Sequence, residues 1–434
     1  MNAPAQRLHR LSPPNLAPRH GLGALGLGLL GLGLLGEAPA WAAGAFVSPT
    51  GGLFADDAEG IRDLRQVRAL IIEDGDAHVM LVQGAAESLS GGMAWLVPLP
   101  VAPESPPLQA PTEGLDTLLA ATDPLYPSLS SCGGCTDCDG LQSANAQDSG
   151  ELVDVRTFGD VVAAGNRAWF GPESAEAMLA ELDYNGLQID AGVEAAILAY
   201  AAQGWGTLVV QLSEDADEGA NSTPVVALRV PAGAPTLPML LSARSVSDEL
   251  EAVVLTVGLG PFGPTEVPQT QPLLGKPLYA VSYTPTFYEA RLRVAVQEAG
   301  GGAWALEYSG AGPSLLERYS SIDAASGGGG GAAGLNLASD TGEAPTAEAE
   351  LFGLFDELVE AGLLTEGFTA KGAHFTRWRT FLKPEDLRDQ AFAPDPAVPT
   401  FEVTLSSSSY DARLELLLWP ALLGVGALRR RRVR

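Results

Sequence analysis

Glycine and proline are unusually frequent in this chain of 434 residues, which contains 51 glycines and 32 prolines. Proline interrupts helices and central strands, and glycine favours turns, so both residue types keep regular elements short. Apolar residues make up 46% of the chain, which is enough to bury a substantial core. The composition therefore predicts many strands joined by turns and argues against a helical bundle.

The charge balance is strongly acidic, with 53 acidic against 25 basic residues and a net charge of −28. Nucleic-acid phosphates would be repelled, so a nucleic-acid partner is excluded. Four histidines and three cysteines make a metalloenzyme with several imidazole ligands hard to build. Residues 43–412 carry 16 basic and 51 acidic side chains, a net charge of about −35.

Residues 1–42 have the features of a signal peptide. Arg7, Arg10 and Arg19 precede a Leu/Gly/Ala run at 22–36, and the small residues of Ala-Trp-Ala at 40–42 form a cleavage site. A permanent N-terminal anchor is the alternative, but the apolar run is short for a bilayer core of about 30 Å. We therefore expect export.

Residues 406–434 form a second terminal feature: a polar linker at 406–409, an apolar stretch within 414–428, and five arginines at 429–432 and 434. Thirteen apolar residues in a helix cover only about 20 Å, so a span is marginal, although arginines can snorkel. The basic end would stay in the cytoplasm. We expect a membrane contact through 414–428, placing the protein in the periplasm or at the cell surface; a last core helix and a processed sorting tail are the alternatives.

The clearest local signal in the body is a hairpin at 67–82. Apolar residues alternate on both sides of Asp74-Gly75, a dipeptide typical of a tight turn between two strands. A third strand is expected at 93–101, where Pro98 and Pro100 place it at a sheet edge or near its own end.

The remaining pattern mixes strands with a few helices, which predicts an α+β fold. It suggests a strand-rich domain at 43–325, a Gly-rich linker at 326–345 and a C-terminal part of the same domain at 346–405. Helices are expected at 112–121, 174–182, 190–203 and 346–364. Further strands are expected at 152–158, 207–212, 224–230, 238–242, 253–257, 278–283, 290–296, 374–382 and 401–405.

Cys132, Cys135 and Cys138 form the densest reactive cluster. In an exported protein they meet an oxidising compartment, so a disulfide with one cysteine left over is the favoured interpretation. A metal site would need a fourth ligand from Asp137, Asp139 or His78. A redox role is the third alternative, although no βαβ unit or helix N-terminus follows to lower a thiol pKa.

Other motifs indicate chemistry only weakly. The GxGxxG at 258–263 follows a strand, but Pro261 and the prolines beyond it leave no helix to receive a pyrophosphate. Asp215, Asp217, Gly219 and Asn221 could contribute to a calcium loop, but a solvated hairpin tip fits better because no Glu stands at the twelfth position. Neither GxSxG nor HExxH occurs, and His78 and His374, in strand patterns, are expected to be surface or core residues.

Several segments, in order along the chain, resemble a family of exported bacterial proteins classed as domain of unknown function 2330. They are Gly-Met-Ala-Trp-Leu-Val-Pro-Leu-Pro at 92–100, Thr-Arg-Trp-Arg at 376–379, and the stretches 184–189, 200–205, 224–230, 237–242 and 382–387. The resemblance covers roughly residues 44–405. It implies a secreted or membrane-tethered envelope protein, and it implies no reaction.

Together these features predict an exported, non-enzymatic envelope protein with a binding or structural role and no cofactor. One alternative is a hydrolase that uses a pair of carboxylates with separated pKa values. The other is a metal-binding or redox module built on the three cysteines.

Overall fold

The computed structural model describes residues 44–49, 64–86, 89, 92–124, 156–158, 161–164, 166–212, 221–231, 233, 235–265, 269–270, 285–325 and 346–403. All of them belong to one compact unit. The described residues form six α-helices and three sheets of nine, seven and three strands. The expected strand-rich α+β body is confirmed.

The nine-stranded sheet is mixed, with β13 parallel to β2 and β15 parallel to β16. Its order is β15-β16-β17-β13-β2-β3-β11-β5, and β19 also pairs with β16. The strands are β2 (Leu64–Asp74), β3 (Ala77–Ala86), β5 (Leu108–Ala110), β11 (Val225–Pro231), β13 (Leu250–Gly258), β15 (Gln269–Thr270), β16 (Trp304–Ala311), β17 (His374–Leu382) and β19 (Phe401–Glu402).

The seven-stranded sheet is antiparallel, in the order β6-β7-β8-β10-β4-β1-β9. Its strands are β1 (Ala45–Pro49), β4 (Ala94–Leu99), β6 (Arg156–Phe158), β7 (Val161–Ala164), β8 (Arg167–Phe170), β9 (Leu187–Gln188) and β10 (Gly206–Gln211). The third sheet contains β12 (Thr236–Leu237), β18 (Gln390–Pro394) and β14 (Phe262–Pro264).

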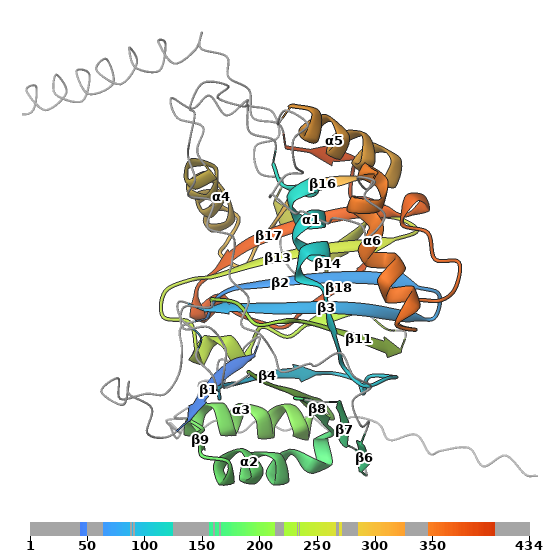
Figure 1. The fold of residues 1–434 in the computed structure, drawn as a ribbon. Helices are drawn as coiled ribbons and strands as arrows, with labels where there is room; N and C mark the ends of the chain where they lie inside the picture. Colours follow the sequence, from blue (N-terminus) through green and yellow to red (C-terminus); the bar gives the residue numbers. More distant parts are fainter. Residues whose placement is uncertain are drawn as a thin grey trace, which may run out of the picture. The chain divides into compact units, whose positions relative to one another are not determined.

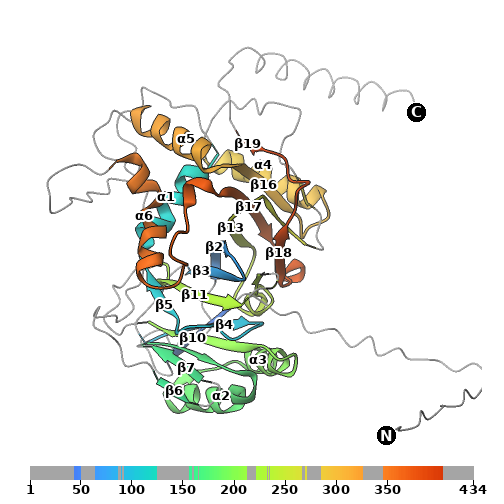
Figure 2. The same ribbon diagram turned by 90° about the vertical axis from the view of Figure 1, so that its right-hand side faces the viewer.

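The sheets stack in the middle of the unit, and helices cover the outside (Figures 1 and 2). Helices α1 (Thr112–Thr122), α4 (Pro285–Glu298), α5 (Gly312–Ala325) and α6 (Ala347–Glu360) cover one face of the nine-stranded sheet. The other face packs on the seven-stranded sheet through a cluster that includes Ile71, Trp95 and Val210. Helices α2 (Ala175–Tyr184) and α3 (Ala191–Ala202) cover the far side of the seven-stranded sheet.

The predicted hairpin at 67–82 is confirmed as β2 and β3. Asp74 pairs with Ala77, so the two-residue loop is Gly75-Asp76, and Gly75 adopts φ +68°, a conformation that favours glycine. Because both faces of this sheet are covered, alternate residues enter different clusters: Ile71 faces the second sheet and Leu70 faces the helices.

Strand β4 is correctly predicted but does not lie at an edge, because it pairs with β10 on one side and β1 on the other. Pro98 is tolerated because β1 pairs only with Ala94–Leu96, while Pro98 lies opposite Thr207 of β10. The backbone nitrogen of Pro98, which has no hydrogen to donate, therefore faces the side of β4 on which pairing with β1 has already ended.

The strands predicted at 290–296 and 238–242 are wrong. Leu292, Val294 and Val296 alternate in sequence, but they belong to helix α4, where Tyr288, Leu292 and Val296 form a buried stripe four residues apart. Val294 is 47% exposed on the other side of that helix. The segment at 238–242 enters a 3-10 turn, η2 (Leu241–Arg244).

The segments on both sides of the predicted linker join one sheet. Strand β16, which precedes residues 326–345, pairs with β17, which follows them. The linker itself, 278–283 and the start of the strand predicted at 152–158 lie outside the described residues.

Candidate functional site

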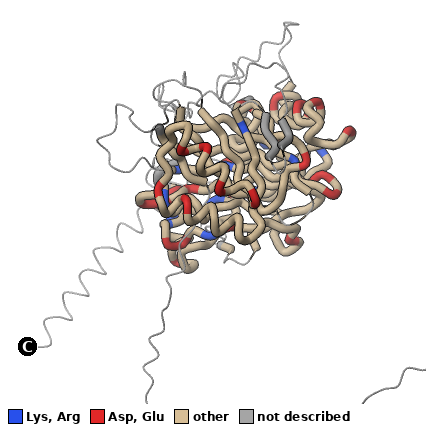
Figure 3. The backbone as a smooth tube through the Cα atoms, turned by 90° about the horizontal axis from the view of Figure 1, so that it is seen from below, with Lys and Arg blue, Asp and Glu red and all other residues tan. Residues whose placement is uncertain are grey.

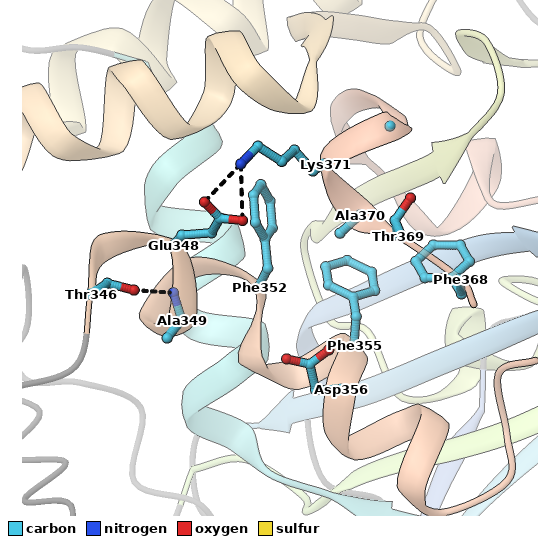
Figure 4. Close-up of a pocket in the computed structure, with 11 residues that line it drawn as sticks. Thr346, Glu348, Ala349, Phe352, Phe355, Asp356, Phe368, Thr369, Ala370 and Lys371 are labelled. Atoms are coloured by element: carbon cyan, nitrogen blue, oxygen red, sulfur yellow. Dashed lines mark hydrogen bonds and ion pairs between the residues drawn. The ribbon is translucent and has the colours of Figure 1, made fainter. Parts of the chain in front are cut away.

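A hollow opens on the surface between helix α6 and the short turn η3 (Ala370–Gly372). The sequence builds its first wall locally, because the Thr346 hydroxyl accepts a hydrogen bond from the N–H of Ala349 (3.2 Å) and starts α6. Apolar residues recur at helical spacing, so Phe352 and Phe355 lie on the inner side of α6. The hollow has a volume of about 680 Å³ (Figure 4).

Three phenylalanines form the apolar floor of this hollow. Phe355 and Phe368 stack with ring centroids 5.5 Å apart, and Phe352 stacks on Phe375 of β17 at 5.9 Å. Phe375 is fully buried, so the floor is fixed to a central strand of the sheet. Phe368 is only half-buried, which leaves aromatic surface available to a ligand.

Charged side chains stand at the rim of the hollow. Nζ of Lys371 lies 2.9 Å and 3.1 Å from the two carboxylate oxygens of Glu348, and both side chains are about half exposed. Asp356 lies beside Phe355 (Figure 4). It is exposed and makes no ion pair with any described residue. The hollow therefore offers one paired and one unpaired carboxylate next to aromatic rings.

The surface next to the hollow is acidic. Burial raises the pKa of Glu357, and the negative charges of Glu360 and Glu113 raise it further. Helix α1 packs against α6, which brings Glu113 to this surface. The like-charge contribution, although smaller than that of burial, means that Glu360 and Glu113 lie close to Glu357 and add to the negative charge of this surface.

A second polar feature is a buried ion cluster on the helix-covered face of the nine-stranded sheet. Nε of Arg377 lies 2.6 Å from Oε2 of Glu307, and the Arg377 guanidinium also contacts Asp123 at 2.5 Å. Arg379 pairs with Glu251, and with Glu289 at 3.0 Å. Arg318 of α5 lies 2.5 Å from Glu402. Its guanidinium also donates a hydrogen bond to the carbonyl oxygen of Asp123, which connects it to the same cluster.

Glu307 reaches this cluster through the alternation of strand β16, because Ala305, two residues earlier, already lies on the helix-covered face. The β16–β17 register shifts between Leu306 and Tyr308, so Glu307 and Tyr308 both lie on the helix-covered face. Burial alone would lower the pKa of Arg379, but the carboxylates of Glu307 and Glu251 outweigh it and raise that pKa. The cluster is thus internally paired, and it holds α1, α4, α5 and β19 against the central strands.

One serine–histidine contact appears that the sequence did not predict. Oγ of Ser309 lies 2.9 Å from Nε2 of His374. Ser309 is 1% exposed, and burial lowers the pKa of His374 with no contribution from a charged neighbour. Among the described residues no carboxylate pairs with His374, so this contact has two members of a nucleophile–base–carboxylate arrangement and not the third.

The carboxyls with raised pKa values do not form a pair within a described cleft. Burial raises the pKa of Asp389, against hydrogen bonds from the N–H groups of Leu240 and Met239 and from the Tyr200 hydroxyl. Asp389 therefore connects the loop before β18 to Met239 and Leu240, which lead into η2, and to Tyr200 of helix α3. Glu357 stands elsewhere, on the exposed side of α6.

The GxGxxG segment runs into strand β14 and not into a helix, which agrees with the expectation from the prolines, and its backbone is already engaged. The N–H of Leu259 donates to Oε2 of Glu73 (2.9 Å). A Cβ added to Gly258 would lie 2.7 Å from that same carboxylate oxygen. This turn therefore holds a carboxylate of the chain itself where a phosphate would have to bind.

The residues proposed from the sequence for metal or disulfide chemistry lie largely outside the described part. Cys132, Cys135, Cys138, Asp137 and Asp139 fall there, as do Asp215, Asp217 and Gly219. Of the described candidates, His78 packs edge-on against Phe262 (6.4 Å), and burial lowers its pKa. Asn221 accepts a backbone hydrogen bond from Ala86. The described residues contain no group of three His, Cys, Asp or Glu placed to hold a metal ion.

The sequence interpretation missed the hollow, although it predicted the helix at 346–364 that forms its first wall. Phe368 and Lys371 carry no motif, and nothing local predicts that they return to α6. One weak signal exists: Phe352 and Phe355 are three residues apart, with the acid Asp356 next to them.

Comparisons with known proteins identify no family. No family model and no curated protein matches the chain, so the resemblance to domain of unknown function 2330 stays a prediction. Among solved structures, the crystal structure of baculovirus P35 is similar at 10% identity and a TM-score of 0.26, over 45% of this chain and 64% of that one. The match thus spans less than two thirds of that protein, and at this score it supports no conclusion.

Within the described ranges, no helix is both long and apolar enough to cross a bilayer. Residues 1–43 and 404–434 lie outside those ranges, so the predicted signal peptide and the tail at 414–428 are not part of that finding.

Proposed function

We propose that this protein is an exported, non-enzymatic binding protein of the cell envelope, and that its ligand inserts an apolar group into the hollow between α6 and η3. The observation that supports this most is the aromatic floor, which is fixed by Phe375 and still partly exposed at Phe368. Ligand sites are typically concave and apolar, with a few polar groups that orient the ligand. The hollow has this composition, with Glu348, Lys371 and Asp356 as the polar groups.

The proposed location rests on the sequence. The leader at 1–42 has the features of an export signal, and the tail at 414–428 supplies an apolar segment. The acidic body should be repelled from anionic headgroups, so we assign any membrane contact to the tail. Cell fractionation tests this: the full chain should be found with the membrane, and a chain ending at residue 405 should be released into the periplasm. A truncated chain that stayed with the membrane would contradict the tether.

Binding in the hollow can be tested on the full chain with three fluorinated probes of similar size: 4-fluorophenethylammonium, 4-fluorophenethyl alcohol and 3-(4-fluorophenyl)propionate. Ala349→Trp should fill the hollow from an exposed position on α6, and Ala361→Trp is the matched control at the far end of that helix. Fluorine NMR should show saturable binding of at least one probe, lost in Ala349→Trp and kept in Ala361→Trp. If no probe binds, or if both variants bind equally, the proposed function is wrong.

A further inference from the structure

The rim of the hollow is built for positive charge. Asp356 stands beside the aromatic floor and has no ion-pair partner among the described residues. Glu348 already holds an ammonium group, that of the chain's own Lys371. Lys371 comes from η3 and reaches across the hollow to α6 (Figure 4). The Lys371–Glu348 pair is thus an ammonium–carboxylate contact within the hollow itself, and Asp356 could make the same kind of contact with a ligand.

The surroundings extend this preference beyond the two rim carboxylates. Partial burial raises the pKa of Glu357, which follows Asp356 in α6, and the like charges of Glu360 and Glu113 raise it further, so carboxylates gather along this part of α6. Acidic positions are spread over the view in Figure 3, with fewer basic positions among them. A cation approaching the hollow is therefore attracted, and an anion is repelled.

The shape of the hollow favours a polypeptide segment over a small amine. Several of its lining residues, including Thr346, Thr369 and Lys371, are exposed. A ligand here would keep much of its surface in water, whereas pockets for small molecules bury most of theirs. A segment that presents two or three side chains suits an open hollow of about 680 Å³. A second copy of this acidic chain would be repelled.

We infer that the hollow binds a basic amphipathic segment of a partner polypeptide, with an apolar side chain on the three phenylalanines and a lysine or arginine at Asp356. This inference rests on the proposed function and specifies its ligand. The partner's cation adds an ion pair at Asp356 to the apolar contact, while Lys371 neutralises Glu348 and repels that cation. Removing Asp356 and removing Lys371 should therefore change affinity in opposite directions.

The test is calorimetric titration of the full chain with three peptides: acetyl-Lys-Leu-Phe-Lys-amide and the same sequence with Gln or Glu in place of Lys. The Lys peptide should bind roughly tenfold more tightly than the Gln peptide, and the Glu peptide should bind most weakly. Asp356→Asn should weaken binding of the Lys peptide by roughly 2–5-fold, and Lys371→Met should strengthen it by a similar factor. Asp183→Asn, an exposed change on helix α2, is the matched control and should have no effect.

If the Gln and Lys peptides bind equally and Ala349→Trp abolishes both, the hollow is a binding site but the inference about charge is wrong. If Asp356→Asn and Lys371→Met both leave the affinity unchanged, the inference is also wrong. If the fluorinated probes bind but no peptide binds in a way that Ala349→Trp abolishes, the inference about the partner is wrong and the proposed function stands; if the probes also fail, both proposals fall.

The chain's own basic end is the competing occupant. Replacing the five arginines at 429–432 and 434 by glutamine should leave the affinity for the Lys peptide unchanged. A tenfold increase would mean that the chain's own terminus competes for the hollow, and it would overturn the assignment to a separate partner.

Discussion

Replacing Arg377 by methionine tests the buried ion cluster most directly. The Arg377 guanidinium contacts Glu307 at 2.6 Å, Asp123 at 2.5 Å and the carbonyl oxygen of Leu119 at 2.5 Å. Its side chain is 6% exposed. Methionine keeps much of the length and apolar volume but removes the charge and every hydrogen-bond donor.

The expected loss depends on what each former partner does afterwards. Asp123 is 45% exposed, so water can solvate it, and its share of the loss should be within about 1 kcal/mol. Glu307 is 0% exposed and keeps only Arg379, 3.7 Å away, as a described cationic neighbour. Leaving a buried carboxylate without its main partner typically costs ~3–5 kcal/mol. Glu307 therefore dominates the expected loss for Arg377→Met.

Urea denaturation followed by tryptophan fluorescence provides the assay, because Trp304 and Trp378 lie in the core beside this strand pair. Combining Arg377→Met with Glu307→Met removes both charges and should restore at least about 2 kcal/mol relative to Arg377→Met alone. Arg293→Met is the control. Arg293 also pairs with two carboxylates but is 37% exposed, so its loss should stay near 1 kcal/mol or below. A loss under about 1 kcal/mol for Arg377→Met, or additive losses in the double variant, would refute this reasoning.

Three further predictions concern pH and glycine packing. Burial alone would raise the pKa of Asp74, but hydrogen bonds from Thr365 and Arg229 lower it below 3.8, so the folded state binds fewer protons than the unfolded state. The stability of the protein should therefore fall as the pH drops through this lowered value. Urea midpoints measured from about pH 5 to 2 should show this fall, and Asp74→Asn should flatten it. Asp389 has the opposite sign: its raised pKa makes the folded state bind more protons, so stability should decline as pH rises from 3.8 through the raised value, and thermal midpoints of Asp389→Asn should lack that decline. Gly114→Ala should destabilise the protein by about 1–3 kcal/mol, because the added Cβ would lie 2.7 Å from Cβ of Leu354. Gly353→Ala has open space around its Cβ and should stabilise the protein by about 0.5–1 kcal/mol. Equal urea midpoints for the two variants would contradict this packing argument.

Local sequence chemistry was sufficient where neighbouring residues decide the structure. A tight turn at Gly75-Asp76 joins the two strands of the hairpin at 67–82, and Thr346 and Asp190 cap helices α6 and α3 through their own side chains. These signals act over a few residues, so they do not depend on the rest of the chain. The same locality explains the error at 290–296, where a short alternating pattern fits a strand as well as the buried stripe of a helix.

Contacts between distant residues were decided by the tertiary structure. Arg377 and Glu307 are 70 positions apart, and only the pairing of β16 with β17 brings the two side chains together on the helix-covered face. In the hollow, α6 supplies Phe352 from its own periodicity, but Phe368 arrives because the segment leading into β17 returns beside that helix.

The chain thus determined by itself its acidic charge, its strand-rich character and the apolar face of α6. Which side chains lie next to that face, and whether they leave a hollow with an unpaired carboxylate, were settled only when the sheets packed. The physical reason is that secondary-structure signals arise from neighbours along the chain, whereas burial and ion pairing follow from the arrangement that satisfies the whole core at once.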